Sequence, residues 1–185
     1  MATYAVTPPL STSFVRQLRA GDTVSITGVI YTARDAAHKR LVDLLEQGKP
    51  LPVDISGQVI YYVGPTPPKP GKAAGSAGPT TSVRMDAYTP QMLAQGLKAM
   101  IGKGKRAPAV VEAMKEHGAV YLGAVGGAAA LISRRIQKVE VVAYQDLGTE
   151  AIHKFYVDKF PTIVLIDAEG TSLYETEPPK YAVTE

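Results

Sequence analysis

The sequence contains no cysteine among its 185 residues. This absence excludes disulfides, thiol catalysis and any zinc or iron–sulfur site that the chain would hold through its own cysteine ligands. Histidine is also scarce: the chain has three, and they are widely spaced, at His38, His117 and His153. We therefore expect no metal site on this chain, so that any metal in the functional assembly would come from a partner.

Long apolar segments and dense runs of positive charge are missing as well. The longest apolar runs fall far short of the ~20 residues that a bilayer crossing needs, and the start of the chain lacks the charged and apolar regions of a secretion signal. The net charge is a modest +3, and the basic residues are scattered. These features predict a cytoplasmic protein that binds neither membranes nor nucleic acid, although small anions suit its charge.

The residues that are present describe an ordinary globular chain, with 45% hydrophobic and 20% charged residues. Its length favours a single domain, 1–185. Strand patterns alternate with helix patterns, which is typical of the α/β class. Strands are predicted at 22–30, 57–64, 118–125, 138–144 and 161–170, and helices at about 32–48, 89–100, 108–116 and 126–136.

Two candidates for anion binding lie at the start of the first long helix. Thr32 and Asp35 have the spacing of a capping box, and Arg34 between them would sit where free N–H groups and the helix dipole favour an anion. A surface arginine paired with Asp35 or Glu46 explains the same pattern. His38 lies one turn further along, on the side of Arg34, where a partly exposed histidine or one that orients a substrate group would fit.

A second candidate follows a loop at 65–79 that is rich in proline and glycine. A loop of this length inside a compact domain is usually functional or disordered. It ends in "GPTTSVRMD" (78–86), where the hydroxyls of Thr80, Thr81 and Ser82 can converge on one oxyanion and Arg84 adds positive charge. A plain polar turn is the competing interpretation.

Lysines between glycines form the third candidate. In "GKGKR", the glycines would let the backbone approach a ligand beside Lys103 and Lys105, and a solvated helix end explains the same residues. The glycines and lysines between Gly64 and Ala73 lack the spacing of a phosphate-binding P-loop.

Five motifs, "TARDAAHKR", "VGPTPP", "GPTTSVRMD", "IGKGKR" and "GAVGGAAAL", together resemble one enzyme family along nearly the whole chain. They resemble the β subunit of a two-subunit class I fumarate hydratase. They equally resemble the C-terminal half of single-chain class I fumarases and the β subunit of L(+)-tartrate dehydratase. This resemblance implies a three-layer swivelling β/β/α domain, and an α subunit that carries a [4Fe-4S] cluster, with the active site at the junction of the two.

The resemblance also implies roles for individual residues. Substrate contacts fall to Arg34, Thr80, Arg84 and Lys103. Thr81, beside Thr80, is a further candidate for substrate binding, and Lys105 competes with Lys103. Thr80 is the implied catalytic base, working with an acidic group of the other subunit, because a threonine hydroxyl is too weak a base alone; otherwise it positions the substrate. His38, Asp35 and Ser82 would support the site without contacting the substrate. The open iron of the partner's cluster would act as Lewis acid on the departing hydroxyl.

The expected activity is reversible hydration of fumarate to (S)-malate, shared with the α subunit in a heterotetramer. The substrate would be a C4 dicarboxylate, which two arginines and a lysine can hold by both carboxylates. Dehydration of L(+)-tartrate is the alternative within the family. A non-catalytic anion-binding or assembly module is the alternative of another class, and the isolated chain is expected to self-associate through an apolar surface meant for its partner.

Overall fold

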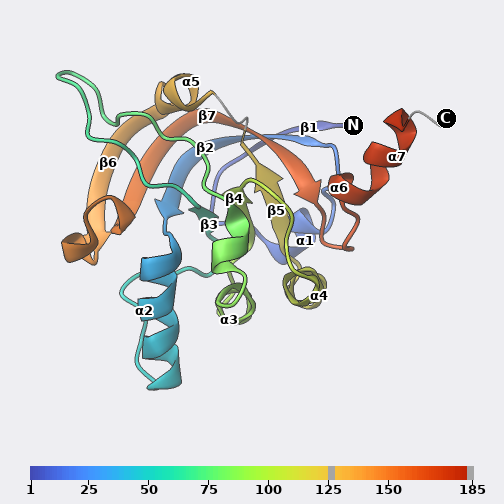
Figure 1. Ribbon diagram of the computed structural model, residues 1–185, viewed down its shortest axis with the longest axis horizontal. Helices are drawn as coiled ribbons and strands as arrows, with labels where there is room; N and C mark the ends of the chain where they lie inside the picture. Colours follow the sequence, from blue (N-terminus) through green and yellow to red (C-terminus); the bar gives the residue numbers. More distant parts are fainter. Residues whose placement is uncertain (125–127, 183–185) are drawn as a thin grey trace.

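A computed structural model describes residues 1–124 and 128–182, and its strands form one connected sheet (Figure 1). Within the described ranges, no helix combines the length and the apolar character that crossing a bilayer requires. The strands are β1 (Thr3–Val6), β2 (Thr23–Thr32), β3 (Val59–Tyr61), β4 (Ala99–Gly102), β5 (Val120–Gly123), β6 (Ile136–Ala143) and β7 (Ile152–Ile166).

Five of these strands close into a mixed barrel. Strands β2, β3, β4 and β5 are parallel neighbours, and β7 pairs antiparallel with both β5 and β2, so the ring is complete. Strand β1 extends the ring beside β2, and β6 extends it beside β7. The mixed α/β class is thus confirmed. The antiparallel pairing of β2 with β7 joins the parallel strands to β7 within one sheet.

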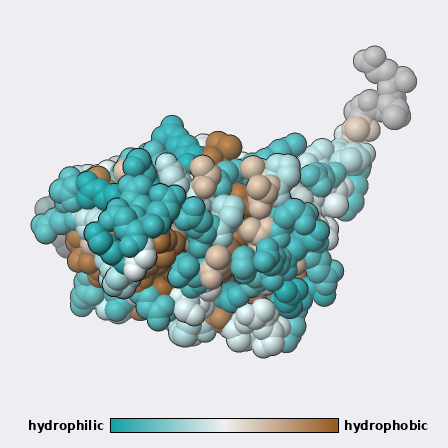
Figure 2. Space-filling model, turned by 90° about the horizontal axis from the view of Figure 1, so that it is seen from below, coloured by the Kyte–Doolittle hydropathy of each residue, from teal (hydrophilic) through white to brown (hydrophobic). Residues whose placement is uncertain are grey.

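Helices cover the outer face of the parallel strands (Figure 1). Figure 2 looks from below, onto the side of α2, α3 and α4, and hydrophilic residues cover most of the face seen there. The α-helices are α1 (Thr12–Val15), α2 (Asp35–Glu46), α3 (Thr89–Ala94), α4 (Pro108–His117), α5 (Ala129–Ser133), α6 (Leu173–Thr176) and α7 (Pro178–Tyr181), and the 3-10 helices are η1 (Ser82–Met85) and η2 (Gln145–Glu150).

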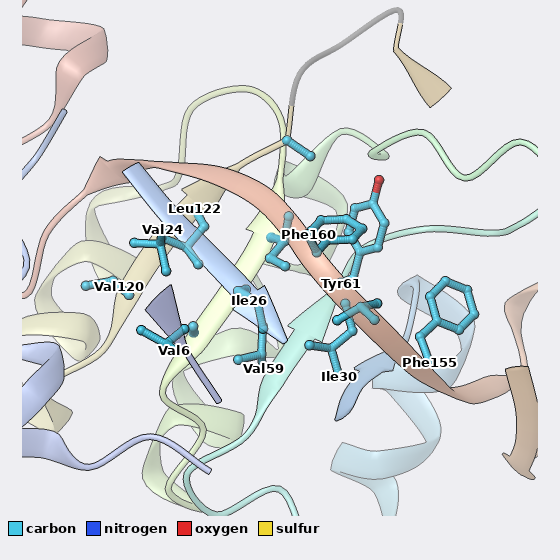
Figure 3. Packing of buried hydrophobic residues seen from close by; sticks show 14 of the residues in the cluster. Val6, Val24, Ile26, Ile30, Val59, Tyr61, Val120, Leu122, Phe155 and Phe160 are labelled. Carbon is cyan, nitrogen blue, oxygen red and sulfur yellow. The ribbon is translucent and has the colours of Figure 1, made fainter. Parts of the chain in front are cut away.

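Two hydrophobic cores lie on the two faces of the parallel strands, because side chains of a strand alternate between its faces. Val59 and Tyr61 of β3 belong to the core inside the barrel, where the ring of Tyr61 packs edge-on to Phe160 of β7 (Figure 3). Ile60 of β3 points outward and belongs to the core beneath the helices. Tyr121 of β5 points the same way, and both side chains are at most 1% exposed. The barrel core and the helix core therefore fix the parallel strands from both sides.

The sequence prediction of one helix over 89–100 is wrong. Helix α3 ends at Ala94, and Gly96 follows with φ of +92°, a left-handed conformation that ends a helix readily. The next apolar run forms the buried strand β4, with partners in β3 and β5. A short apolar run fits a buried strand and a buried helix equally well in a sequence.

Candidate active site

The predicted site residues lie at the carboxyl ends of neighbouring parallel strands. Arg34 comes two residues after the end of β2, and Lys103 directly follows β4. Between them, β3 leads into Gly64 and the long loop. The carboxyl ends of parallel strands meet at one edge of a sheet, and this edge is where α/β proteins usually bind ligands.

The predicted capping box at the start of α2 is wrong. Arg34 itself occupies the cap position in an extended conformation and makes no side-chain cap hydrogen bond. The hydroxyl of Thr32 instead accepts a hydrogen bond from the backbone N–H of His153 at 3.1 Å, across the β2–β7 pairing. This contact fixes the end of β2 to the barrel and thereby the point at which Arg34 leaves it.

The guanidinium of Arg34 is held by a carboxylate that sequence reasoning did not identify. Its Nη2 lies 3.1 Å from Glu150 and 3.7 Å from Asp35, and the side chain is 21% exposed. Gly64 gives it room, since a Cβ there would lie 3.2 Å from Nη1. The buried Nε has no hydrogen-bond partner within the described part of the chain. Arg34 is thus oriented by Glu150 while one of its donors remains unused.

His38 is fully buried, so the interpretation as a partly exposed histidine is wrong. Its Nδ1 lies 2.8 Å from the carbonyl oxygen of Arg34, and because a carbonyl only accepts, Nδ1 carries the proton. The ring packs edge-on to Tyr62 with centroids 5.4 Å apart. Burial lowers the pKa of His38 to about 4, so the ring is neutral at physiological pH. His38 therefore holds the backbone of Arg34 as a neutral donor.

The segment Thr80 to Ser82 lies against the end of β4 as a short added strand. The N–H of Thr80 donates to the carbonyl of Tyr62 at 2.7 Å, and the N–H of Ser82 donates to the carbonyl of Lys103 at 2.9 Å. Thr81 and Lys103 form a parallel bridge. The backbone thus brings together the threonines and the lysine that the sequence places about twenty residues apart.

Ser82 and Arg84 differ in where they lie. Ser82 is buried, with its Oγ 2.8 Å from the hydroxyl of Tyr121, so it supports the segment from inside. Arg84 lies in η1 and is exposed, and η1 contacts α2, the helix that Arg34 precedes. The two arginines therefore belong to segments that touch one another.

The two lysines of "GKGKR" belong to different surroundings. Lys103 is the residue that pairs with Thr81. Lys105 lines a separate cavity of about 180 Å³ between α4 and α6, together with Pro108 and Tyr174. This separation favours Lys103 over Lys105 as the residue next to the threonines.

A buried ion pair between Asp86 and Arg106 joins two of the candidate motifs, and sequence reasoning assigned neither residue a role. Nε of Arg106 lies 2.7 Å from Asp86 Oδ1, and the side chains are 0% and 9% exposed. Asp86 ends "GPTTSVRMD" and Arg106 ends "GKGKR". Opposite charges at the ends of two such motifs were a signal that they could pair, but burial cannot be read from the sequence.

The donor atoms of this chain do not fit an iron–sulfur cluster. The chain has no cysteine, and residues 1–124 and 128–182 contain no group of three or more histidine, aspartate or glutamate side chains placed to hold a metal ion. The predicted "GAVGGAAAL" motif includes residues 125–127, which lie outside the described residues. The candidate site is accordingly a set of cationic and hydroxyl groups.

Comparison with known proteins identifies relatives of this chain. Residues 5–177 match the family model described as "Fumarase C-terminus". The aerobic class I fumarate hydratase of Escherichia coli K12 is 42% identical over 154 residues, which are 82% of this chain and 28% of that protein. Mitochondrial fumarate hydratase 1 of Leishmania major is 40% identical over 82% of this chain and 28% of its own length. The chain thus spans less than a third of these enzymes.

One relative is similar in length. A protein of Methanocaldococcus jannaschii, provisionally described as L(+)-tartrate dehydratase subunit beta, is 37% identical over 87% of this chain and 86% of its own length.

Proposed function

The chain belongs to the fumarase C-terminal domain family, whose members include class I fumarate hydratases and a tartrate dehydratase β subunit, and we propose that it acts as the substrate-clamping β subunit of a hydro-lyase. The proposed substrate is fumarate or (S)-malate. A partner α subunit is part of the proposal, because one relative is described as a β subunit. The proposed partner carries the [4Fe-4S] cluster, since this chain lacks the ligands for it. Swivelling of this domain against the partner also remains a prediction.

The proposal is supported by two observations: Arg34 and Lys103 follow the carboxyl ends of parallel strands of one sheet, and Thr81 pairs with Lys103. A C4 dicarboxylate carries one negatively charged carboxylate at each end of the molecule, so its binding site requires cations on two sides. Charged hydrogen bonds from guanidinium groups to carboxylates are short and directional. Arg34, oriented by Glu150, and the exposed Arg84 lie on contacting segments, and Lys103 lies beside the threonines.

These groups would also favour the reaction itself. When a proton leaves the carbon next to a carboxylate, negative charge moves onto the carboxylate oxygens. Cations held in place before the reaction, as Glu150 holds Arg34, bind this charge more tightly than the charge of the ground state. The cations thereby lower the barrier to proton removal.

Thr80 is the proposed proton acceptor, acting with an acidic group of the partner subunit. A threonine hydroxyl alone is far too weak a base at neutral pH, so without that group it would only position the substrate. His38 is not the base in this proposal, because its ring is fully buried and its Nδ1 already donates to the carbonyl of Arg34.

The substrate is tested by reconstituting the chain with its cluster-bearing α subunit and measuring turnover of (S)-malate and of L(+)-tartrate. The proposal expects brisk malate turnover. Negligible malate turnover beside brisk tartrate turnover would assign the complex to tartrate dehydration, which the similarity to the archaeal β subunit favours as the second candidate.

The catalytic role is tested in the same complex with Arg84→Ala and with Arg135→Ala, an exposed arginine after α5, as matched control. Loss of one positive charge at the reacting carboxylate is expected to lower turnover by roughly 10²–10³-fold. A non-catalytic assembly module instead predicts equal turnover for both variants. A stoichiometric iron–sulfur cluster on the isolated chain would contradict the assignment of the cluster to the partner.

A further inference from the structure

The core beneath the candidate site contains a polar cluster formed by Asp86, Arg106, Tyr121 and Ser82. We propose that this cluster positions the Thr80–Thr81 segment relative to Lys103, and that its members are positioning residues for the reaction although none of them contacts the substrate. The inference rests on the proposed function, because the groups that it places are the proposed substrate ligands.

Both carboxylate oxygens of Asp86 accept hydrogen bonds. Asp86 Oδ1 accepts from Nε of Arg106 at 2.7 Å, and Oδ2 accepts from the backbone N–H of Ala107 at 2.7 Å. The pair is shielded from solvent, because the Arg106 side chain is 0% exposed. A buried charge needs its partner far more than an exposed one does. The end of the segment 78–86, which contains the threonines, is therefore fixed to the end of the segment 102–106, called here the lysine loop.

Arg106 is held on its other sides as well. Its Nη2 donates to the hydroxyl of Thr89 at 2.8 Å. Its guanidinium carbon lies 5.3 Å from the ring centre of Tyr62 and 5.0 Å from that of Tyr121, so both rings contribute cation–π contacts. A lysine at this position keeps the charge but has neither the planar fork nor the stacking face.

Tyr121 connects the two sides of the proposed site through one hydroxyl. Its O–H donates to the carbonyl oxygen of Gly104 at 3.0 Å and accepts from the hydroxyl of Ser82 at 2.8 Å. Ser82 directly follows Thr81, and Gly104 directly follows Lys103. One phenol thus contacts the neighbours of both proposed substrate ligands.

The packing leaves little freedom around this hydroxyl. A Cβ on Gly102 would overlap Ser82 Oγ, so only glycine lets the serine approach β4. The N–H of Gly104 donates to the hydroxyl of Tyr174 at 3.0 Å, which holds the lysine loop from the side of α6. Burial raises the pKa of Tyr121, so its hydroxyl stays a donor throughout the range in which enzymes work. The spacing of the threonines and Lys103 is therefore set from inside the domain.

The test uses the complex with the α subunit and two conservative variants. Tyr121→Phe removes one oxygen and Arg106→Lys keeps the charge. Tyr156→Phe and Arg135→Lys are the matched controls; Tyr156 also donates from a phenol to a side chain, Glu140, but on β7. Misplacing reacting groups by a fraction of an ångström is expected to lower kcat/KM by roughly 10–100-fold in the first two variants. The controls are expected to stay within about twofold of the parent chain.

Three further measurements separate positioning from general loss of structure. The hydroxyls of Ser82 and Tyr121 act through one contact, so the combined Ser82→Ala and Tyr121→Phe variant is expected to lose little more kcat/KM than the more impaired single variant. Hydrogen exchange on the isolated chain is expected to accelerate at the amides of Ser82 and Gly104 in Tyr121→Phe. The thermal midpoint of the same variant shows that the chain is still folded.

The results also distinguish this inference from the proposed function. Control-like kcat/KM in Tyr121→Phe and Arg106→Lys, beside a large loss in Arg84→Ala, would overturn the positioning role alone. Unchanged turnover in Arg84→Ala would overturn the proposed function, and the hydrogen-exchange result would then decide whether the cluster still fixes the two segments. If Arg106→Lys does not fold, Tyr121→Phe decides alone, because it only deletes a hydroxyl.

Discussion

Replacing Asp86 by asparagine would neutralise the carboxylate that faces the buried guanidinium of Arg106. The asparagine oxygen can still accept one hydrogen bond, but the positive charge would remain in a site where the Arg106 side chain is 0% exposed. Removing one partner of a buried pair typically lowers the free energy of unfolding by about 3–5 kcal/mol. Because Asp86→Asn retains one hydrogen bond, we expect a loss of about 3 kcal/mol. For a chain of this length, that loss lowers the thermal midpoint by about 6–12 °C.

The measurement is thermal or urea unfolding of the isolated chain, with Asp146→Asn as the matched control. Asp146 also forms a two-pronged pair with an arginine, Arg40, at 2.6 and 2.9 Å, but its side chain is 64% exposed. Solvent screens such a pair, so the control is expected to unfold at the midpoint of the parent chain. Equal midpoints for Asp86→Asn and Asp146→Asn would refute the argument that burial makes the Asp86–Arg106 pair important.

Three other predictions concern single residues. Burial lowers the pKa of His38 to about 4, so the unfolded chain binds this proton at higher pH than the folded chain does, and about 3 kcal/mol of stability is lost as the pH falls from about 6.5 to about 4. The urea midpoint of the parent chain should therefore fall over this pH range more steeply than that of His38→Phe. Parallel curves would contradict a buried neutral ring. Lys103→Ala is expected to raise the KM for the dicarboxylate in the reconstituted complex by roughly tenfold or more, because one charged hydrogen bond to the substrate is lost. Lys105→Ala is expected to leave this KM unchanged. The reverse order of effects would assign the site to Lys105. Gly102→Ala places a Cβ on Ser82 Oγ and is expected to cost about 1–3 kcal/mol in urea unfolding, and a neutral result would show that the serine can move aside.

The sequence predicts the parts of the fold that are encoded locally. The alternating pattern at 22–30 corresponds to β2, and the spacing of apolar residues in 32–48 corresponds to α2. Closure of the barrel was not predictable, because it depends on contacts between β2 and β7 that are over a hundred residues apart. The first half of β7 escaped prediction although polar and apolar residues partly alternate in it, because the charged pair Asp158–Lys159 interrupts the pattern where Lys159 has φ of +49°.

The candidate site was predictable to a similar degree. The motifs contain Arg34, Thr80 and Lys103, and their residue types suit a dianion. The pairing of Arg34 with Glu150 could not be predicted, because it requires η2 to fold back onto α2. The support of the site by Arg106 was equally hidden, since a sequence shows an arginine in a polar motif and gives no sign that its side chain is enclosed by two tyrosine rings.

The double pairing of β7 has a consequence for synthesis on the ribosome. Strands β2 and β5 each expose an unpaired edge until β7, which ends at Ile166, has emerged and filled the gap between them. Open strand edges are templates for association with other chains, and contacts so distant in the sequence form late. A nascent or truncated chain that ends before Ile152 would therefore keep both edges open, and it is the form of this protein most in need of a chaperone.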